Sequence, residues 1–170
     1  MTNWKVAACT LGAVAGLAVL VWLAWPSQTP DAAAPTRQYL DASACLLTGA
    51  QGVAGDPQAA AWQGMENTSL ATRVRVQYLA VRGPATAANA RPYLASLLQR
   101  HCDVVLAVGP AQVAAVAAEA ARFRSVRFIT VGDTKHAPAA TLTTVPASPA
   151  GEVRAAVSGA VAAALSQEGL

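Results

Sequence analysis

The chain has 170 residues, of which 54% are hydrophobic and 12% charged, and its net charge is +3. This length suits one domain with an appendage and excludes two full domains. The basic residues are scattered, and the densest group, Arg122, Arg124 and Arg127, lies between two apolar runs. A nucleic-acid-binding protein has a continuous basic stripe or a known module, so we expect no nucleic-acid partner.

The first predicted element is a membrane-spanning helix. Residues 6–25 contain no charged side chain, and a run of roughly 20 such residues is enough to cross a bilayer. Trp25 lies where an interfacial aromatic residue is expected, and Pro26 ends the helix. Because Lys5 precedes the run, residues 1–5 are expected in the cytoplasm. We therefore predict a single-pass protein of the cell membrane with its C-terminal domain extracytoplasmic.

Two other interpretations of this segment were weighed. The stretch "DAAAP" at residues 31–35 offers a small-residue cleavage site, but a cleaved signal peptide has a shorter apolar core than this one. The "VAAC" ending at Cys9 resembles a lipobox. A lipobox cysteine follows its apolar core, whereas here the core follows the cysteine. We expect an uncleaved anchor and no lipoprotein.

Beyond the anchor, a linker leads into alternating strands and helices. Residues 26–40 are rich in proline, alanine and hydroxyl side chains without periodicity, which is typical of a linker. The run "ACLLTG" at 44–49 predicts a buried strand. Asp56 and Pro57 are then expected as the N-cap and first-turn proline of a helix. The stretch "RVRVQYLAV" at 73–81 alternates polar and apolar side chains, so Val74, Val76 and Tyr78 are expected on a buried face and Arg73, Arg75 and Gln77 on a wet one. The arginines favour an edge strand.

The second half of the sequence continues the alternation. We predict a helix containing 92–100, a buried strand over 103–108, an alanine-rich helix over about 112–122, strands over 126–131 and 140–145, and a final helix from Ser148-Pro149. Five strands alternating with helices predict an α/β fold, a parallel sheet between two helix layers. Crossover handedness and the edge character of the second strand favour the order 2-1-3-4-5. Residues 41–147 would form one lobe, followed by a C-terminal helix over 148–170.

No motif in the sequence points to catalysis. Gly49, Gly52 and Gly55 follow a strand, but their spacing is not that of a dinucleotide-binding loop, and the second strand is not followed by the expected acidic residue. No phosphate-binding lysine follows a glycine loop. The two histidines, His101 and His136, have no partner at metal-ligand spacing. We therefore expect a protein that is not an enzyme and that uses no cofactor and no metal.

Two cysteines are placed on neighbouring strands by the predicted order. Cys45 and Cys102 each lie near the beginning of a strand. Outside the cytoplasm the redox environment favours a disulfide between them. Two buried free thiols are an equally good interpretation, because a register shift of two residues would place the cysteines too far apart.

An ordered set of segments resembles a known family. The segments are "CLLTG", "AWQGM", "PYLASLLQRHCDVVLAVGPAQVAAVAAEAARF" and "VRFITVGD", and the match runs from residue 44 to about 165. Together they resemble the basic membrane protein family of ABC-transporter solute-binding lipoproteins, which includes nucleoside binders. The resemblance implies a type 1 periplasmic binding fold and covers about the first half of a family member, corresponding to its first lobe.

The sequence departs from this family at the ligand site. The Phe-Asn pair whose aromatic ring stacks on the ligand falls on Pro57 and Gln58, and the aspartate that closes the fourth strand falls on Gly132, one residue before Asp133. The second lobe, which closes over the ligand, has no counterpart. Burial between two walls is what gives such sites their affinity, so the departures predict weak binding.

Two functions follow from the family resemblance and the departures. The first is a membrane-anchored extracytoplasmic solute-binding-like protein that takes a small solute such as a nucleoside weakly, with a transporter or another envelope protein as partner. The alternative is a non-catalytic interaction module of the cell envelope that has kept the fold and lost the ligand. Fold alone does not decide between them. The candidate ligand contacts share a position at carboxyl ends of strands and are Thr48, Asp56, Gln58, Gln112 and Asp133.

Overall fold

The computed structural model describes residues 38–132 and 140–167. The predicted anchor over 6–25 and the candidate contact Asp133 lie outside the described residues. Within the described ranges, no helix is both long enough and apolar enough to cross a membrane.

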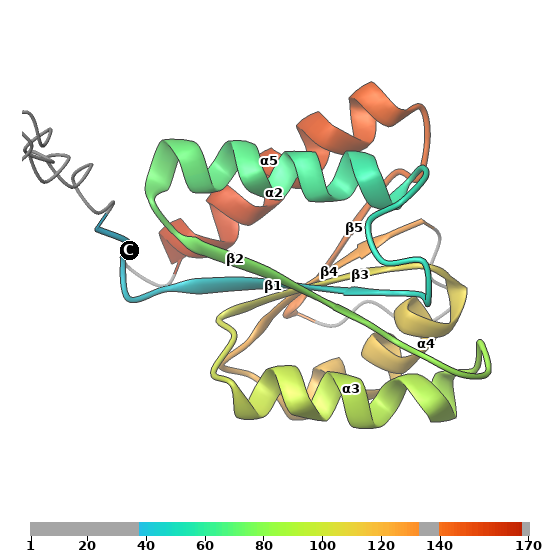
Figure 1. Cartoon of the computed structure of the whole chain (residues 1–170). Coiled ribbons are helices and arrows are strands. Elements are labelled where there is room, and N and C mark those ends of the chain that lie inside the picture. Colours follow the sequence, from blue (N-terminus) through green and yellow to red (C-terminus); the bar gives the residue numbers. More distant parts are fainter. Residues whose placement is uncertain (1–37, 133–139, 168–170) are drawn as a thin grey trace, which may run out of the picture. The chain divides into compact units, whose positions relative to one another are not determined.

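The described residues form a five-stranded parallel sheet with the order β2-β1-β3-β4-β5, which confirms the predicted topology (Figure 1). The strands are β1 (Ser43–Thr48), β2 (Arg75–Ala80), β3 (Val104–Val108), β4 (Arg127–Val131) and β5 (Leu142–Val145). Because every pair is parallel, all the strands begin at one edge of the sheet and end at the other. We call these the amino edge and the carboxyl edge.

Helices cover both faces of the sheet (Figure 1). One face is covered by α2 (Gln58–Thr72) and α5 (Ala150–Gln167), and the other by α3 (Ala87–Gln99) and α4 (Pro110–Glu119). A short 3₁₀ turn, η1 (Ala120–Arg122), extends α4. The central strands β1 and β3 are buried on both faces, which is why their sequences are nearly continuous apolar runs.

Each face of the sheet has its own hydrophobic core. Alternate residues of β1 point to opposite faces, so that Leu46 packs under α2 and α5 while Leu47 packs under α3 and α4. The described residues of both cores lie between Ala42 and Leu165. Because these residues belong to one compact unit that begins at Arg37, we expect a fragment that begins at Pro26 to fold by itself.

The contact between α2 and α5 is unusually close. A Cβ added at Gly64 would lie 2.7 Å from the backbone oxygen of Arg154 and 3.0 Å from the Cβ of Val157. One turn further along, the Thr68 and Ser158 hydroxyls lie 3.1 Å apart. The glycine of the segment "AWQGM" is thus explained by helix packing rather than by a ligand.

Two local predictions are wrong. Asp56 does not cap α2, because the helix begins one residue after Pro57 and the N–H groups of Ala59 and Ala61 bond to the backbone oxygens of Gly55 and Pro57. Tyr78 is not buried with its face of the strand but is 49% exposed. Since β2 is the outermost strand, Tyr78 is only partly covered, in part by the edge-on ring of Trp62 at a centroid distance of 5.4 Å.

Candidate functional site

The carboxyl edge is where parallel α/β sheets bind ligands, and the structure brings several of the predicted contacts to it. Thr48 is the last residue of β1, Gln58 is the first residue of α2, and Gln112 lies in the first turn of α4, directly after β3. Asp56 is exposed in the loop before α2. Because β1 and β3 are neighbours in the sheet, Thr48 and Gln112 come from adjacent strand ends.

Gln112 is the most distinctive polar residue at this edge. It is only 4% exposed. Its Oε1 lies against Gly109, where an added Cβ would come within 2.6 Å of that oxygen. Gly109 has φ 108°, a conformation that side chains other than glycine's rarely adopt. Gly109 therefore turns the chain from β3 into α4 and also leaves room for the Gln112 side chain.

The Gln112 amide has no hydrogen-bond partner within the described part of the chain. Every fully enclosed polar side-chain atom in this part of the chain does have a partner, so the amide must retain contact with solvent at the carboxyl edge. Helix geometry also leaves the backbone N–H groups of Ala111 and Gln112 without intrahelical acceptors. The start of α4 thus combines two backbone donors with an amide that both donates and accepts.

The other predicted contacts are less well suited to a ligand. Thr48 is fully buried, and its hydroxyl donates to the neighbouring Gly49 oxygen at 3.3 Å. Gln58 is half-buried at the beginning of α2, on the opposite face of the sheet from α4. The structure therefore supports Gln112 more strongly than Thr48 or Gln58.

The carboxyl edge carries little net charge among the described residues. Arg82 and Arg154 are balanced there by Asp56 and Glu152. No group of three histidine, cysteine or acidic side chains within 38–132 and 140–167 is arranged to hold a metal ion. The chemistry at this edge is that of neutral donors and acceptors, which suits an uncharged polar solute.

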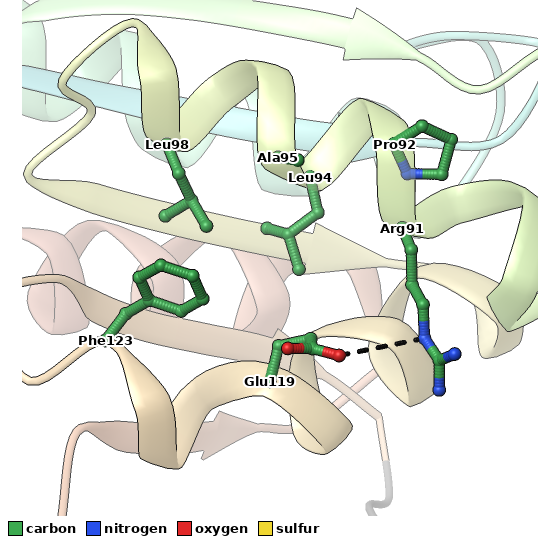
Figure 2. Close-up of a pocket in the computed structure, with 7 residues that line it drawn as sticks. All are labelled: Arg91, Pro92, Leu94, Ala95, Leu98, Glu119 and Phe123. Carbon is green, nitrogen blue, oxygen red and sulfur yellow. Dashed lines mark ion pairs between the residues drawn. The ribbon is translucent and has the colours of Figure 1, made fainter.

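A separate hollow of about 290 Å³ lies between α3 and the end of α4 (Figure 2). Leu94, Leu98 and Phe123 make its walls apolar. At one end the Arg91 Nε lies 3.8 Å from the Glu119 Oε1, and Figure 2 shows these two charged groups directed at each other. Most of the side chains that line this hollow are apolar, so it offers few groups to orient a polar solute.

The amino edge holds the two cysteines. The structure joins Cys45 and Cys102 in a disulfide, with their Cα atoms 5.9 Å apart, which is one of the two arrangements that the sequence left open. Gln77 covers the bridge, with its Nε2 3.2 Å from the Cys45 Sγ and 3.7 Å from the Cys102 Sγ. Sequence reasoning placed Gln77 on the wet face of β2 and missed this contact, although its register opposite Cys45 follows from the parallel pairing.

Asp103 is a second residue of the amino edge that the sequence did not single out. Its Oδ2 accepts a hydrogen bond from the Ser43 backbone N–H at 2.8 Å and lies 3.5 Å from the Ser43 hydroxyl. The same hydroxyl donates to the His101 backbone oxygen at 3.0 Å. These bonds tie the beginning of β3 to the beginning of β1.

Known structures share the fold of the described residues. No protein-family model and no curated protein matches the sequence. A fragment from Peptoclostridium difficile 630 that is assigned as a lipoprotein superposes with a TM-score of 0.60 at 12% identity, covering 73% of this chain and 98% of that one. An ABC transporter system solute-binding protein from Aeropyrum pernix K1 superposes with a TM-score of 0.51 at 16% identity, covering 61% of this chain and 28% of that one.

These identities are low enough that the likeness shows the fold alone. The chain spans 28% of the length of the Aeropyrum solute-binding protein. The resemblance drawn from the sequence segments is thereby supported at the level of the fold, and not at the level of the basic membrane protein family. The described residues have a periplasmic-binding-protein-like fold.

Proposed function

We propose that this chain is a membrane-anchored, extracytoplasmic binding module whose carboxyl edge receives a small uncharged polar solute. The observation that carries the proposal is Gln112, a side chain that is 4% exposed and whose amide has no hydrogen-bond partner among the described residues. Because the amide still reaches solvent at the carboxyl edge, a bound solute can take the place of water as its hydrogen-bond partner. The fold shared with a solute-binding protein agrees with this use of the strand ends.

Two features support a location outside the cytoplasm. The disulfide between Cys45 and Cys102 belongs to an oxidising compartment. The uncharged run over 6–25, preceded by Lys5, has the length and charge placement of an anchor with its N-terminus in the cytoplasm.

The topology is tested with reporters fused after Leu170. We expect a reporter that requires export to be active and one that requires the cytoplasm to be silent, with the product keeping its N-terminus. A mature protein that begins near Pro35 would show that the segment is a cleaved signal peptide and would contradict the anchor.

Ligand binding by the fragment from Pro26 onward is expected to be weak. Pro57 stands where the family resemblance places a stacking ring, and the loss of such a ring costs roughly 1–3 kcal/mol per base in nucleic-acid systems. We therefore expect this fragment to bind nucleosides no tighter than about 1 mM. Calorimetry tests for micromolar binding, and chemical-shift titration follows millimolar binding.

The variant Gln112→Leu tests whether the amide binds the solute, because it nearly keeps the shape of the side chain and removes the amide. Replacing an unpaired buried polar group by an apolar one is nearly neutral or stabilising, so this variant should remain folded while any solute-induced shifts disappear. A micromolar dissociation constant for the monomeric fragment would contradict the expectation of weak binding. Shifts that persist in Gln112→Leu would remove the residue from the proposal.

The second candidate is a non-catalytic envelope interaction module that has lost its ligand. Pro57 in place of the stacking ring favours it. If no nucleoside shifts any resonance of the fragment, this candidate replaces the first. An apparent affinity for nucleosides that rises with protein concentration would instead show that two copies of the fragment form the binding site together.

A further inference from the structure

The charges of the described residues are divided unevenly between the two edges of the sheet. The strand starts, helix ends and connecting segments at the amino edge carry six of the nine described arginines and only three carboxylates, those of Asp41, Asp103 and Glu119. The six are Arg73, Arg75, Arg100, Arg122, Arg124 and Arg127. The carboxyl edge has no such excess, so the net positive charge of the described domain is concentrated at the amino edge.

Much of this charge remains available at the surface. Asp41 pairs with Arg75 at 2.8 Å, and Glu119 pairs with Arg122 at 3.0 Å. Asp103 is held by Ser43. Arg73, Arg100 and Arg124 are exposed and make no ion pair within the described residues. An open hollow of about 560 Å³ lies at this edge, and its lining includes Arg75 and Arg100 together with the carboxylates of Asp41 and Asp103.

Exposed hydrophobic side chains gather at the same edge. Five large hydrophobic residues of the described chain are exposed: Tyr39, Leu40, Leu70, Tyr78 and Phe123. Tyr39 and Leu40 precede β1, Leu70 is in the last turn of α2, and Phe123 follows η1, so all but Tyr78 lie at the amino edge. Phe123 stands between the exposed Arg122 and Arg124. Basic and large apolar side chains on one surface are the combination that binds an anionic lipid interface.

The chain enters the domain at this edge. The described residues begin at Gln38, next to the beginning of β1 (Figure 1). Between the end of the predicted anchor at Trp25 and Gln38 lie 12 residues, which span at most about 40 Å when fully extended. A domain tethered this closely by its amino edge has that edge within reach of the bilayer.

We infer that the amino edge is a membrane-docking surface that binds anionic phospholipid headgroups. The exposed arginines contact the phosphates, and Leu70 enters the boundary between headgroups and acyl chains. This inference rests on the proposed anchor only for its proximity, because the surface itself is built from described residues. Docking turns the carboxyl edge, with Gln112, away from the bilayer and towards solutes or a partner.

The test is a flotation assay with the fragment from Pro26 onward and two vesicle compositions, pure phosphatidylcholine and phosphatidylcholine with 30% phosphatidylglycerol (about one lipid in three, enough to give a negative surface potential). We expect binding to the anionic vesicles that weakens steeply between about 0.1 M and 0.5 M salt. Arg100→Gln/Arg124→Gln should bind about 25-fold more weakly, since each of the two arginines near a charged surface contributes about a five-fold gain. Leu70→Gln should also weaken binding.

The matched control is Arg82→Gln/Arg154→Gln, which removes the same charge from the carboxyl edge and should change binding by less than two-fold. Equal binding to both vesicle compositions, or equal losses in the two double variants, would overturn the docking surface. The melting temperature of each variant confirms that it is folded. The assay needs neither the anchor nor a solute, so its failure leaves the binding proposal standing, and a failed nucleoside titration leaves the docking surface standing.

Discussion

The two edges of the sheet are made from the same strands but present opposite surfaces. The carboxyl edge has a nearly balanced charge and a buried amide at a helix start, whereas the amino edge collects arginines, exposed apolar side chains and the disulfide. Part of this division follows from the helices, because helix C-termini favour cations, and in this fold α2, α3 and α4 all end at the amino edge. The helix dipole does not explain the exposed Leu70 and Phe123. The arginines at the amino edge, taken alone, are explained by the helix C-termini that they lie beside. Arginines together with exposed large apolar side chains on the same edge indicate a surface that binds a partner.

The largest expected change in the free energy of unfolding comes from removing the disulfide of the amino edge. Cys45→Ala/Cys102→Ala should lower the free energy of unfolding by roughly 4 kcal/mol at most, because the bridge closes a loop spanning 57 positions. Urea unfolding of the fragment from Pro26 onward measures the change, and reduced wild-type protein should lose a similar amount. If thiol labelling of the unfolded, unreduced fragment modifies both cysteines, the bridge does not form.

The next effect lies at the carboxyl edge. Gly109→Ala should destabilise the domain by about 1–3 kcal/mol, because alanine is strained at φ 108°. The same substitution made in a Gln112→Ala background should cost nearly as much, since the flexible amide is not the main obstacle. Gly159→Ala is the control: it lies in α5 with no atom within 4 Å of an added Cβ, so it should be stabilising by about 0.5–1 kcal/mol. A Gly109→Ala variant as stable as the wild type would show that this turn is not rigidly held.

The smallest effect concerns the hydrogen bonds of Asp103. Asp103→Ala removes the acceptor of the Ser43 N–H and should cost about 1 kcal/mol, because the site is partly open to water. Asp41→Ala breaks only the exposed pair with Arg75 and should leave the urea midpoint unchanged. Equal losses in the two variants would mean that the join between β1 and β3 does not depend on this carboxylate.

The sequence predicted the sheet because its signals were strong and local. The apolar runs of β1 and β3 and the arginine-bearing β2 determine the strand order, and observed and predicted strand bounds differ by at most two residues. The start of α2 was predicted less well, because backbone carbonyls of Gly55 and Pro57 replaced the expected side-chain cap of Asp56. The site was predicted in part. The position of Gln112 followed from the end of β3, but its burial depends on the space left by Gly109, which the sequence pattern does not reveal.

The disulfide also has a mechanical consequence. Residues 45 to 102, with α2, β2 and α3 between them, form a closed covalent ring. A force applied between an anchored N-terminus and a partner that grips α5 would bypass this ring and stretch only the segments outside it. Because the disulfide carries the force, roughly 200 Å of chain inside the ring is not extended when the domain is stretched. A protease that cuts once between β1 and α2 would likewise leave both pieces joined by the disulfide, so the module can be nicked or strained without coming apart.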